Sequence, residues 1–146
     1  MKVVIIGGVA GGATAAARIR RLDEQAEIVV LERSGFISYA NCGLPYYIGG
    51  VIQDQEELTL QTPQGFWDRF RIDVRVRHEA TAIHREEKTV TVKNLETGEV
   101  TTESYDKLIL APGARPTRPP IPGLDSDRLF SLRTVEDTLA IRTFVE

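Results

Sequence analysis

The sequence lacks several features that mark common classes of protein. It has a single cysteine, Cys42, so no disulfide bond can form within the chain. No apolar run approaches the roughly 18 residues of a membrane span, and Met1-Lys2 leads directly into a strand-like segment rather than a signal peptide. The 18 Lys and Arg against 21 Asp and Glu give a formal net charge of −3, which argues against a nucleic-acid binder driven by bulk charge. We therefore expect a cytoplasmic protein that binds neither membrane nor nucleic acid.

The sequence does have the composition of an ordinary globular domain, with 42% hydrophobic and 27% charged residues. Its 146 residues are enough for one domain and too few for two. It contains no internal repeat, no low-complexity segment and no pattern that predicts a metal site. We expect one domain over residues 1–146, with no bound metal.

The first 31 residues have the pattern of a strand, a glycine-rich turn, a helix and a second strand. Residues 3–6 are a short β-branched run, which is typical of a strand buried on both faces of a parallel sheet. Residues 13–22 follow as a helix, and residues 26–31 are a second buried strand. On one side of the helix lie Gly12, Ala15, Ile19 and Leu22. This order predicts a right-handed βαβ unit.

The middle of the chain contains two short predicted helices. Residues 33–50 are loop-like, with a short helix over about residues 42–48. A second helix begins at Thr62-Pro63, where Thr has the N-cap position and Pro lies in the first turn.

From Asp73 onward, apolar and polar residues alternate in three stretches, at residues 73–77, 89–92 and 100–102. Turns at residues 86–88 and 96–98 separate the later stretches. We interpret the three stretches as an antiparallel meander inserted before a buried strand.

That buried strand covers residues 107–111 and precedes an extended, proline-rich connection over residues 112–122. Residues 134–146 have the pattern of a final helix. The predicted fold class is therefore α/β, with a parallel dinucleotide-binding sheet and an inserted meander.

The glycine-rich turn between Gly7 and Gly12 has the position of a dinucleotide-binding turn, after a strand and before a helix. Small residues there let a pyrophosphate approach the N–H groups at the helix N-terminus. Val9 replaces the middle glycine of the usual pattern, whereas Glu32, 20 residues after Gly12, has the position of a ribose-binding carboxylate. The alternative is that the glycines serve only close packing between helix and strand.

Cys42 lies in a loop that contains Gly, Pro and Asn and precedes a predicted helix. A lone cysteine is more often a buried, inert side chain, but a helix start stabilises a thiolate. The loop context therefore favours a nucleophile over an inert thiol.

Four spaced motifs together resemble the N-terminal part of the pyridine-nucleotide-disulfide oxidoreductases. They are residues 4–14, 30–33, 38–50 and 108–116, and the resemblance extends over essentially the whole chain. The most similar branch has a single redox cysteine and contains coenzyme A disulfide reductase, NADH oxidase and NADH peroxidase. The last motif resembles the family's second flavin-contacting signature, which usually has Thr where this chain has Pro112.

The resemblance implies a Rossmann-like FAD-binding domain. The residues that it implies as FAD contacts are Gly7, Gly8, Val9, Ala10, Gly11, Gly12, Leu31, Glu32, Arg33, Asn41, Ala80, Thr81, Ala111, Pro112 and Gly113. It also implies that NADH or NADPH is bound by a domain outside this chain and that the full-length protein is a homodimer. Residues 1–146 are then an incomplete FAD-binding domain without nicotinamide-binding and dimerisation domains, and we expect this chain not to turn over alone.

Two features select among the members of this branch. The oxidases and peroxidases carry a His where this chain has Ala10, and that His serves their peroxide chemistry as an acid–base group. Residues 41–50 resemble the segment found in coenzyme A disulfide reductases, including those fused to a rhodanese domain. The resemblance implies that Cys42 forms a mixed disulfide with coenzyme A during reduction of coenzyme A disulfide, or of a coenzyme A persulfide or polysulfide.

Substrate contacts are predicted on one face of the first helix. Thr14, Arg18 and Arg21 follow i+4 and i+3 spacing, and Arg suits the phosphates of coenzyme A. The resemblance places Ser38 and Asn41 at the same site, and Gln61 is a further candidate. The alternative for the helix face is a solvated row of charges.

Two other functions remain open at this point. One is an NADH oxidase or peroxidase that uses a sulfenic acid at Cys42. The other is a non-catalytic nucleotide-binding module. We interpret His78 and His84 as surface or structural residues, although the resemblance implies that the backbone near residues 78–81 lies close to the FAD adenine.

Overall fold

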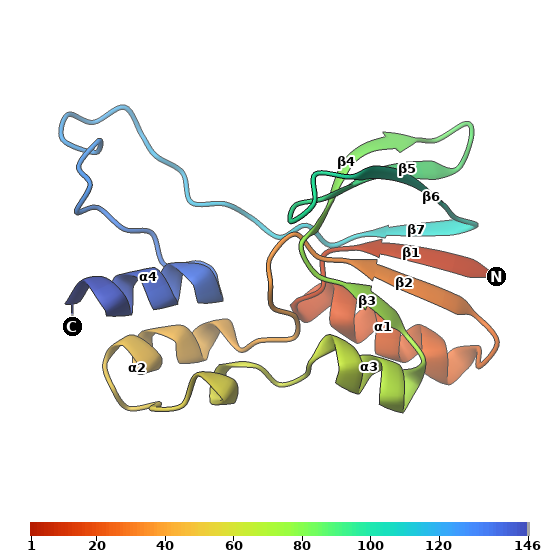
Figure 1. The fold of residues 1–146 in the computed structure, drawn as a ribbon, viewed down its shortest axis with the longest axis horizontal. Coiled ribbons are helices and arrows are strands. Elements are labelled where there is room, and N and C mark those ends of the chain that lie inside the picture. The colour runs from red at the N-terminus through yellow and green to blue at the C-terminus, as the bar shows by residue number, and fades with distance from the viewer. Residues whose placement is uncertain (146) are drawn as a thin grey trace. The chain divides into compact units, whose positions relative to one another are not determined.

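The computed structural model describes residues 1–145 and divides into two compact units (Figure 1). The sheet unit contains residues 1–39 and 60–112. The helical unit contains residues 40–59 and the chain from residue 113 onward. The predicted nucleotide-binding turn belongs to the sheet unit, whereas Cys42 belongs to the helical unit.

The sheet unit is built on four parallel strands in the order β3-β2-β1-β7. These are β1 (Lys2–Ile6), β2 (Glu27–Leu31), β3 (Asp73–Arg75) and β7 (Lys107–Leu110). Helix α1 (Ala10–Leu22) connects β1 to β2 and begins three residues earlier than predicted. The predicted βαβ unit is confirmed, and so is the α/β fold class.

The two faces of the parallel sheet pack against different elements. Val3 and Ile5 of β1 belong to a core that includes Ala16 of α1 and Phe66 of α3 (Pro63–Phe70). The intervening Val4 belongs to a second core with residues of β5. Figure 1 shows α1 and α3 on one face of the sheet and the antiparallel strands on the other. Burial on both faces explains why β1 and β2 are continuous apolar runs. The strand predicted as buried at residues 107–111 is the edge strand β7, which is only partly buried, and its Leu110 is 59% exposed.

The second sheet is an antiparallel meander of β4 (His78–His84), β5 (Thr89–Asn94) and β6 (Val100–Ser104). The predicted turns at residues 86–88 and 96–98 connect its strands. The prediction that the stretch from Asp73 is the first meander strand is wrong, because β3 pairs in parallel with β2. Arg77 has φ +57° and separates β3 from β4, which is the true first strand.

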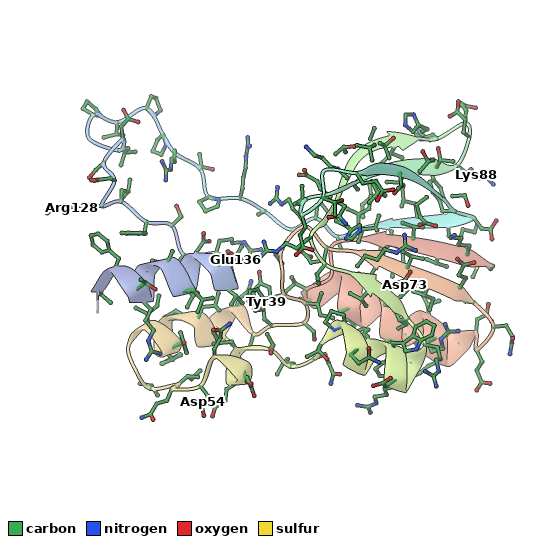
Figure 2. All side chains as sticks on the ribbon, viewed as in Figure 1. Tyr39, Asp54, Asp73, Lys88, Arg128 and Glu136 are labelled. Atoms are coloured by element: carbon green, nitrogen blue, oxygen red, sulfur yellow. The ribbon has the colours of Figure 1, made fainter. Side chains whose placement is uncertain are left out.

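An ion cluster joins the meander to the parallel sheet. Glu103 on β6 accepts from Lys2 at 2.6 Å and from Arg75 at 2.5 Å. Arg75 also pairs with Asp73 at 2.7 Å, and Asp73 is labelled on β3 in Figure 2. Burial alone raises the pKa of Glu103, but the hydrogen bonds from Lys2 and Arg75 outweigh it, so that the pKa lies below its ordinary value.

The two helices on the sheet differ in how well their residues were predicted. In α3, Thr62 is the predicted N-cap, and its hydroxyl accepts a hydrogen bond from the N–H of Gly65 at 3.0 Å. In α1, Leu22 was grouped on one side with Gly12, Ala15 and Ile19, but it is 69% exposed. Ala13 is buried instead, and at about 100° per residue Leu22 lies half a turn around the helix from it.

The helical unit contains the 3-10 helix η1 (Asn41–Gly43), helix α2 (Leu44–Ile48), the 3-10 helix η2 (Gln55–Leu58) and helix α4 (Val135–Val145). In it, the guanidinium of Arg142 lies over the ring of Tyr47 at 4.3 Å. The last residue of the predicted final helix, Glu146, lies outside the described residues. None of the helices within residues 1–145 has the length and apolar character needed to cross a membrane.

Candidate functional site

The glycine-rich turn is sterically required at two positions. Gly7 has φ +101°, and a Cβ there would overlap the carbonyl oxygen of Ala111 in the residue after β7. A Cβ at Gly12 would overlap the carbonyl oxygen of Gly7. The N–H of Gly7 donates a hydrogen bond to the carbonyl of Leu31 at the end of β2, at 2.8 Å. The two glycines therefore let α1 begin directly against the carboxyl ends of β1 and β7.

The N-terminus of α1 carries N–H groups without a side-chain cap. Val9 occupies the N-cap position and makes no side-chain cap hydrogen bond, and the first turn contains no acidic residue. The first N–H groups of a helix have no partner inside the helix, and the helix dipole adds partial positive charge there. The turn from Gly8 to Gly12 therefore suits the pyrophosphate of a dinucleotide.

Glu32 is a buried carboxylate at the end of β2, with only 9% of its surface exposed. Its Oε2 accepts from the N–H of Gly8 at 2.7 Å, and its Oε1 accepts from the N–H of Ser34 at 2.7 Å. Each carboxylate oxygen has capacity for a further hydrogen bond. Glu32 therefore fixes the turn to β2 and keeps capacity to accept further hydrogen bonds; its contact with ribose hydroxyls stays a prediction.

A pocket of about 170 Å³ lies beside Glu32. Six predicted cofactor residues line it: Gly7, Leu31, Glu32, Arg33, Ala80 and Pro112. Three further lining residues were not assigned as contacts: Ile6, His78 and Glu79. The turn, the buried carboxylate and the pocket fit the adenosine and pyrophosphate parts of FAD, so this chain's residues are compatible with that cofactor. We name this the nucleotide pocket.

His78 is the lining residue whose role the sequence obscured. Its Nδ1 lies 2.7 Å from the carbonyl oxygen of Val76, and because a carbonyl only accepts, this nitrogen carries the proton. The hydrogen bond orients the ring at the start of β4. The segment implied to lie near adenine, residues 78–81, begins at His78, and this was the signal that could have identified the residue as part of the lining.

The remaining predicted cofactor residues have different surroundings. Ala111 lies beside the turn, since a Cβ at Gly11 would contact its Cβ at 3.5 Å. Thr81 is exposed on β4, and its hydroxyl donates to the carbonyl of Thr91 at 3.3 Å, away from the pocket lining. Gly113, with φ +70°, belongs to the helical unit, as does Asn41.

A second pocket of about 280 Å³ lies between α1 and α3, and we name it the helix pocket. Four of its lining residues were predicted as substrate contacts: Thr14, Arg21, Ser38 and Gln61. Five others complete it: Ala13, Ala17, Phe66, Arg69 and Phe70. Arg18 was predicted to share this face but is exposed and does not line the pocket.

The helix pocket combines two cations with aromatic rings and hydroxyls. Arg69 lies over the ring of Phe70 at 5.0 Å, and Phe66 and Phe70 pack with ring centroids 5.7 Å apart. Ser38 has φ +47°. Its N–H donates to the carbonyl of Gly8, and its carbonyl accepts from the N–H of Leu60, at 3.0 Å each. This set of groups can accommodate phosphate charge together with a flat heterocyclic ring.

Cys42 is exposed at the centre of η1, in the helical unit. The N–H of Gly43 donates to the carbonyl of Ala40 at 2.9 Å, which closes the turn around it. Leu44 is buried and anchors the start of α2 immediately after η1. Cys42 is thus an accessible thiol on an ordered turn. The described residues contain no group of three or more His, Cys, Asp or Glu placed to hold a metal ion.

Comparisons with known proteins agree on one family. The model of the pyridine nucleotide-disulphide oxidoreductases matches residues 1–144. Coenzyme A disulfide reductase from Staphylococcus aureus (strain JH9) is 48% identical over 145 residues, which are 99% of this chain and 32% of that protein. The chain therefore spans about a third of the length of this curated relative.

Solved structures give the same result. Reduced Bacillus anthracis CoADR-RHD has a TM-score of 0.96 and 52% identity over 99% of this chain and 26% of its own. A NAD-dependent persulfide reductase from A. fulgidus has a TM-score of 0.93 and 38% identity, over 99% of this chain and 27% of its own. With the family model matched almost from end to end, the chain belongs to the pyridine nucleotide-disulphide oxidoreductases.

Proposed function

We propose that this chain is the flavin-side part of an FAD-dependent NAD(P)H:disulfide oxidoreductase that reduces coenzyme A disulfide or a coenzyme A persulfide or polysulfide. The observation that carries the proposal is the helix pocket, whose Arg21 and Arg69 suit phosphate groups. Ser38 lines this pocket, and the exposed Cys42 follows four residues later in the chain. The similarity to coenzyme A disulfide reductase and persulfide reductase supports the same substrate class.

FAD is proposed to bind in the nucleotide pocket. The turn from Gly7 to Gly12 would face its pyrophosphate, and Glu32 would accept hydrogen bonds from its adenosine ribose. Asn41, Thr81, Ala111 and Gly113 remain proposed contacts. When bound, FAD supplies the electron pair for disulfide reduction.

Cys42 is proposed to act as the nucleophile. Its thiolate attacks one sulfur of coenzyme A disulfide, the S–S bond breaks, and one coenzyme A thiolate leaves. The product is a mixed disulfide between Cys42 and the other coenzyme A. Two electrons and one proton then convert the mixed disulfide into the Cys42 thiolate and a second coenzyme A thiol. Residues 1–146 contain no second cysteine, and the disulfide partner of Cys42 is proposed to come from the substrate.

The helix pocket is proposed to hold the nucleotide end of coenzyme A. Arg21 and Arg69 would contact its phosphates, and the half-buried Phe70 offers apolar surface for the adenine ring. Cys42 is four positions after Ser38 in the chain, and four extended residues reach at most about 14 Å. The long pantetheine arm of coenzyme A can cover such a distance, so one substrate can engage both.

Three parts of the proposal concern the whole protein. NADH or NADPH is proposed to bind a domain outside these residues, and the full-length protein is proposed to be a cytoplasmic homodimer. This chain alone is proposed to have no NAD(P)H-dependent turnover.

The test is an acceptor assay on the full-length protein. After anaerobic reduction by NAD(P)H, flavin re-oxidation is followed with coenzyme A disulfide, polysulfide, hydrogen peroxide or oxygen. We expect rapid re-oxidation by one of the first two. Cys42→Ser should abolish it and still permit flavin reduction by NAD(P)H. Disulfide reduction at the wild-type rate by Cys42→Ser would refute the nucleophile.

The competing function is an NADH oxidase or peroxidase that uses a sulfenic acid at Cys42. Ala10, at the first position of α1, supplies no acid–base group where those enzymes carry a His. Faster re-oxidation by peroxide or oxygen than by either sulfur acceptor would establish this alternative.

A further inference from the structure

Arg20 links the two helices that form the helix pocket. It lies on α1, next to Arg21, but it does not line the pocket. Its Nε donates to the carbonyl of Phe70 at 2.7 Å, and its Nη2 donates to the carbonyl of Arg71 at 3.0 Å. Both acceptors lie at the C-terminal end of α3. A side chain of one helix thus holds the end of the other.

The same guanidinium also binds the chain after α1. Its Nη1 donates to the carbonyl of Glu24 at 2.6 Å and to that of Asp23 at 3.3 Å. All four acceptors are neutral carbonyls at two helix C-termini, where the helix dipoles favour a positive charge. Only a planar guanidinium has donors fanned out to reach four carbonyls in this way.

The end of α3, where Arg20 binds, has a left-handed backbone conformation. Arg71 has φ +51° and ψ 43°, a left-handed conformation that costs free energy for a residue with a Cβ. Its N–H donates to the carbonyl of Trp67 at 2.8 Å, and its carbonyl is the acceptor for Arg20. The two pocket residues Arg69 and Phe70 directly precede this point.

We infer that Arg20 is a positioning residue for substrate: it sets the distance between α1 and α3 and so the width of the helix pocket. The inference rests on the proposed function, because it assigns the nucleotide end of coenzyme A to that pocket. Arg20 itself contacts no substrate. Its loss moves Arg69 and Phe70 relative to Arg21, which weakens binding of the nucleotide end and leaves the chemistry at Cys42 unchanged.

The experiment compares two disulfides in the full-length enzyme. Coenzyme A disulfide carries the nucleotide end, and pantethine is the related disulfide that lacks it. We expect Arg20→Lys, which keeps the charge but loses the fork, to raise KM for coenzyme A disulfide about tenfold, the size of one charge-assisted hydrogen bond. Its kcat and its KM for pantethine should stay within about twofold of wild type. Arg20→Gln should raise KM for coenzyme A disulfide more than Arg20→Lys does. If Arg20→Gln does not fold, the result for Arg20→Lys alone decides whether Arg20 has the positioning role.

The control is Arg85→Lys, the same substitution at an exposed residue in the turn between β4 and β5, which should change neither KM. An unchanged KM for coenzyme A disulfide in Arg20→Lys, or an equal rise for both disulfides, would overturn the positioning role. If the wild-type enzyme does not reduce coenzyme A disulfide, the proposed function itself fails, and with it this inference.

Discussion

The nucleotide pocket and the helix pocket are built from different parts of the chain. The nucleotide pocket relies on backbone: a glycine turn, N–H groups at a helix start, and a carboxylate held by two further N–H groups. The helix pocket relies on side chains of two helices that are brought together by tertiary packing. A site of the first kind tolerates change in side chains away from its glycines, whereas a site of the second kind depends on the spacing of its helices.

Among substitutions that distinguish the nucleotide pocket from the helix pocket, Gly12→Ala should have the largest effect, which is a loss of folding stability. The added Cβ would overlap the carbonyl oxygen of Gly7 in backbone that cannot move aside, so we expect a loss of more than about 3 kcal/mol in unfolding free energy. Gly11→Ala is the matched control, since its Cβ would make an ordinary 3.5 Å contact with Ala111. Urea unfolding should show that this control stays within about 1 kcal/mol of wild type. Equal stability of both variants would contradict a sterically required turn.

The next effect should be on FAD affinity, through Glu32→Ala. Removing the carboxylate leaves the N–H groups of Gly8 and Ser34 without their acceptor and removes the ribose contact. A hydrogen bond to a charged group contributes about 1.5–3 kcal/mol, so loss of the proposed ribose contact should lower FAD affinity about 100-fold. Fluorescence titration of the flavin-free full-length protein measures it. Glu87→Ala, at an exposed turn of the meander, should bind FAD like wild type.

A smaller effect is expected in the helix pocket. Arg21→Ala should raise KM for coenzyme A disulfide about tenfold by removing one phosphate contact, without reducing the FAD content of the purified enzyme. Arg18→Ala provides the comparison, because Arg18 lies outside the pocket lining and should change KM less than about threefold. Steady-state kinetics decide between them. A larger rise in KM for Arg18→Ala than for Arg21→Ala would indicate that the substrate binds the exposed helix face that the sequence predicts, and not the helix pocket.

The smallest effect should be the pH response of the ion cluster that holds the meander, one wall of the nucleotide pocket. The pKa of Glu103 lies below its ordinary value of 4.5, despite burial, because of Lys2 and Arg75. A lowered pKa in the folded state adds stability above pH 4.5, and this stability is lost as pH falls through the folded value. Thermal unfolding between pH 6 and pH 3 should therefore show a steeper acid loss for wild type than for Glu103→Gln. Parallel curves would mean that Glu103 contributes no pH-dependent stability.

Most of the sheet unit could be predicted because its signals are local. A β-branched run, a glycine turn and an acidic residue at fixed spacing all lie within the first 32 residues. The assignment of β3 failed because alternation of residues 73–77 fits a strand in either sheet. The pairing with β2 and the turn at Arg77 place β3 in the parallel sheet. No local sequence pattern indicates either feature.

The same distinction separates the site residues. Gly7, Gly12 and Glu32 were found from sequence because the backbone geometry itself demands them. Arg69 and Phe70 were missed because only the packing of α3 beside α1 brings them to the pocket. Helical spacing placed Arg18 and Arg21 on one face but could not locate where the second wall of that pocket would lie.

The proposed mixed disulfide between Cys42 and coenzyme A is tested most directly by the mass of the peptide that contains Cys42. The full-length enzyme is reduced, separated from reductant, mixed with excess coenzyme A disulfide and digested without added thiol. We expect a coenzyme A adduct on Cys42 that dithiothreitol removes. The enzyme must also consume coenzyme A disulfide when NAD(P)H is supplied. If it does, and Cys42 is found as an unmodified thiol or carrying only oxygen, the nucleophilic role of Cys42 is contradicted.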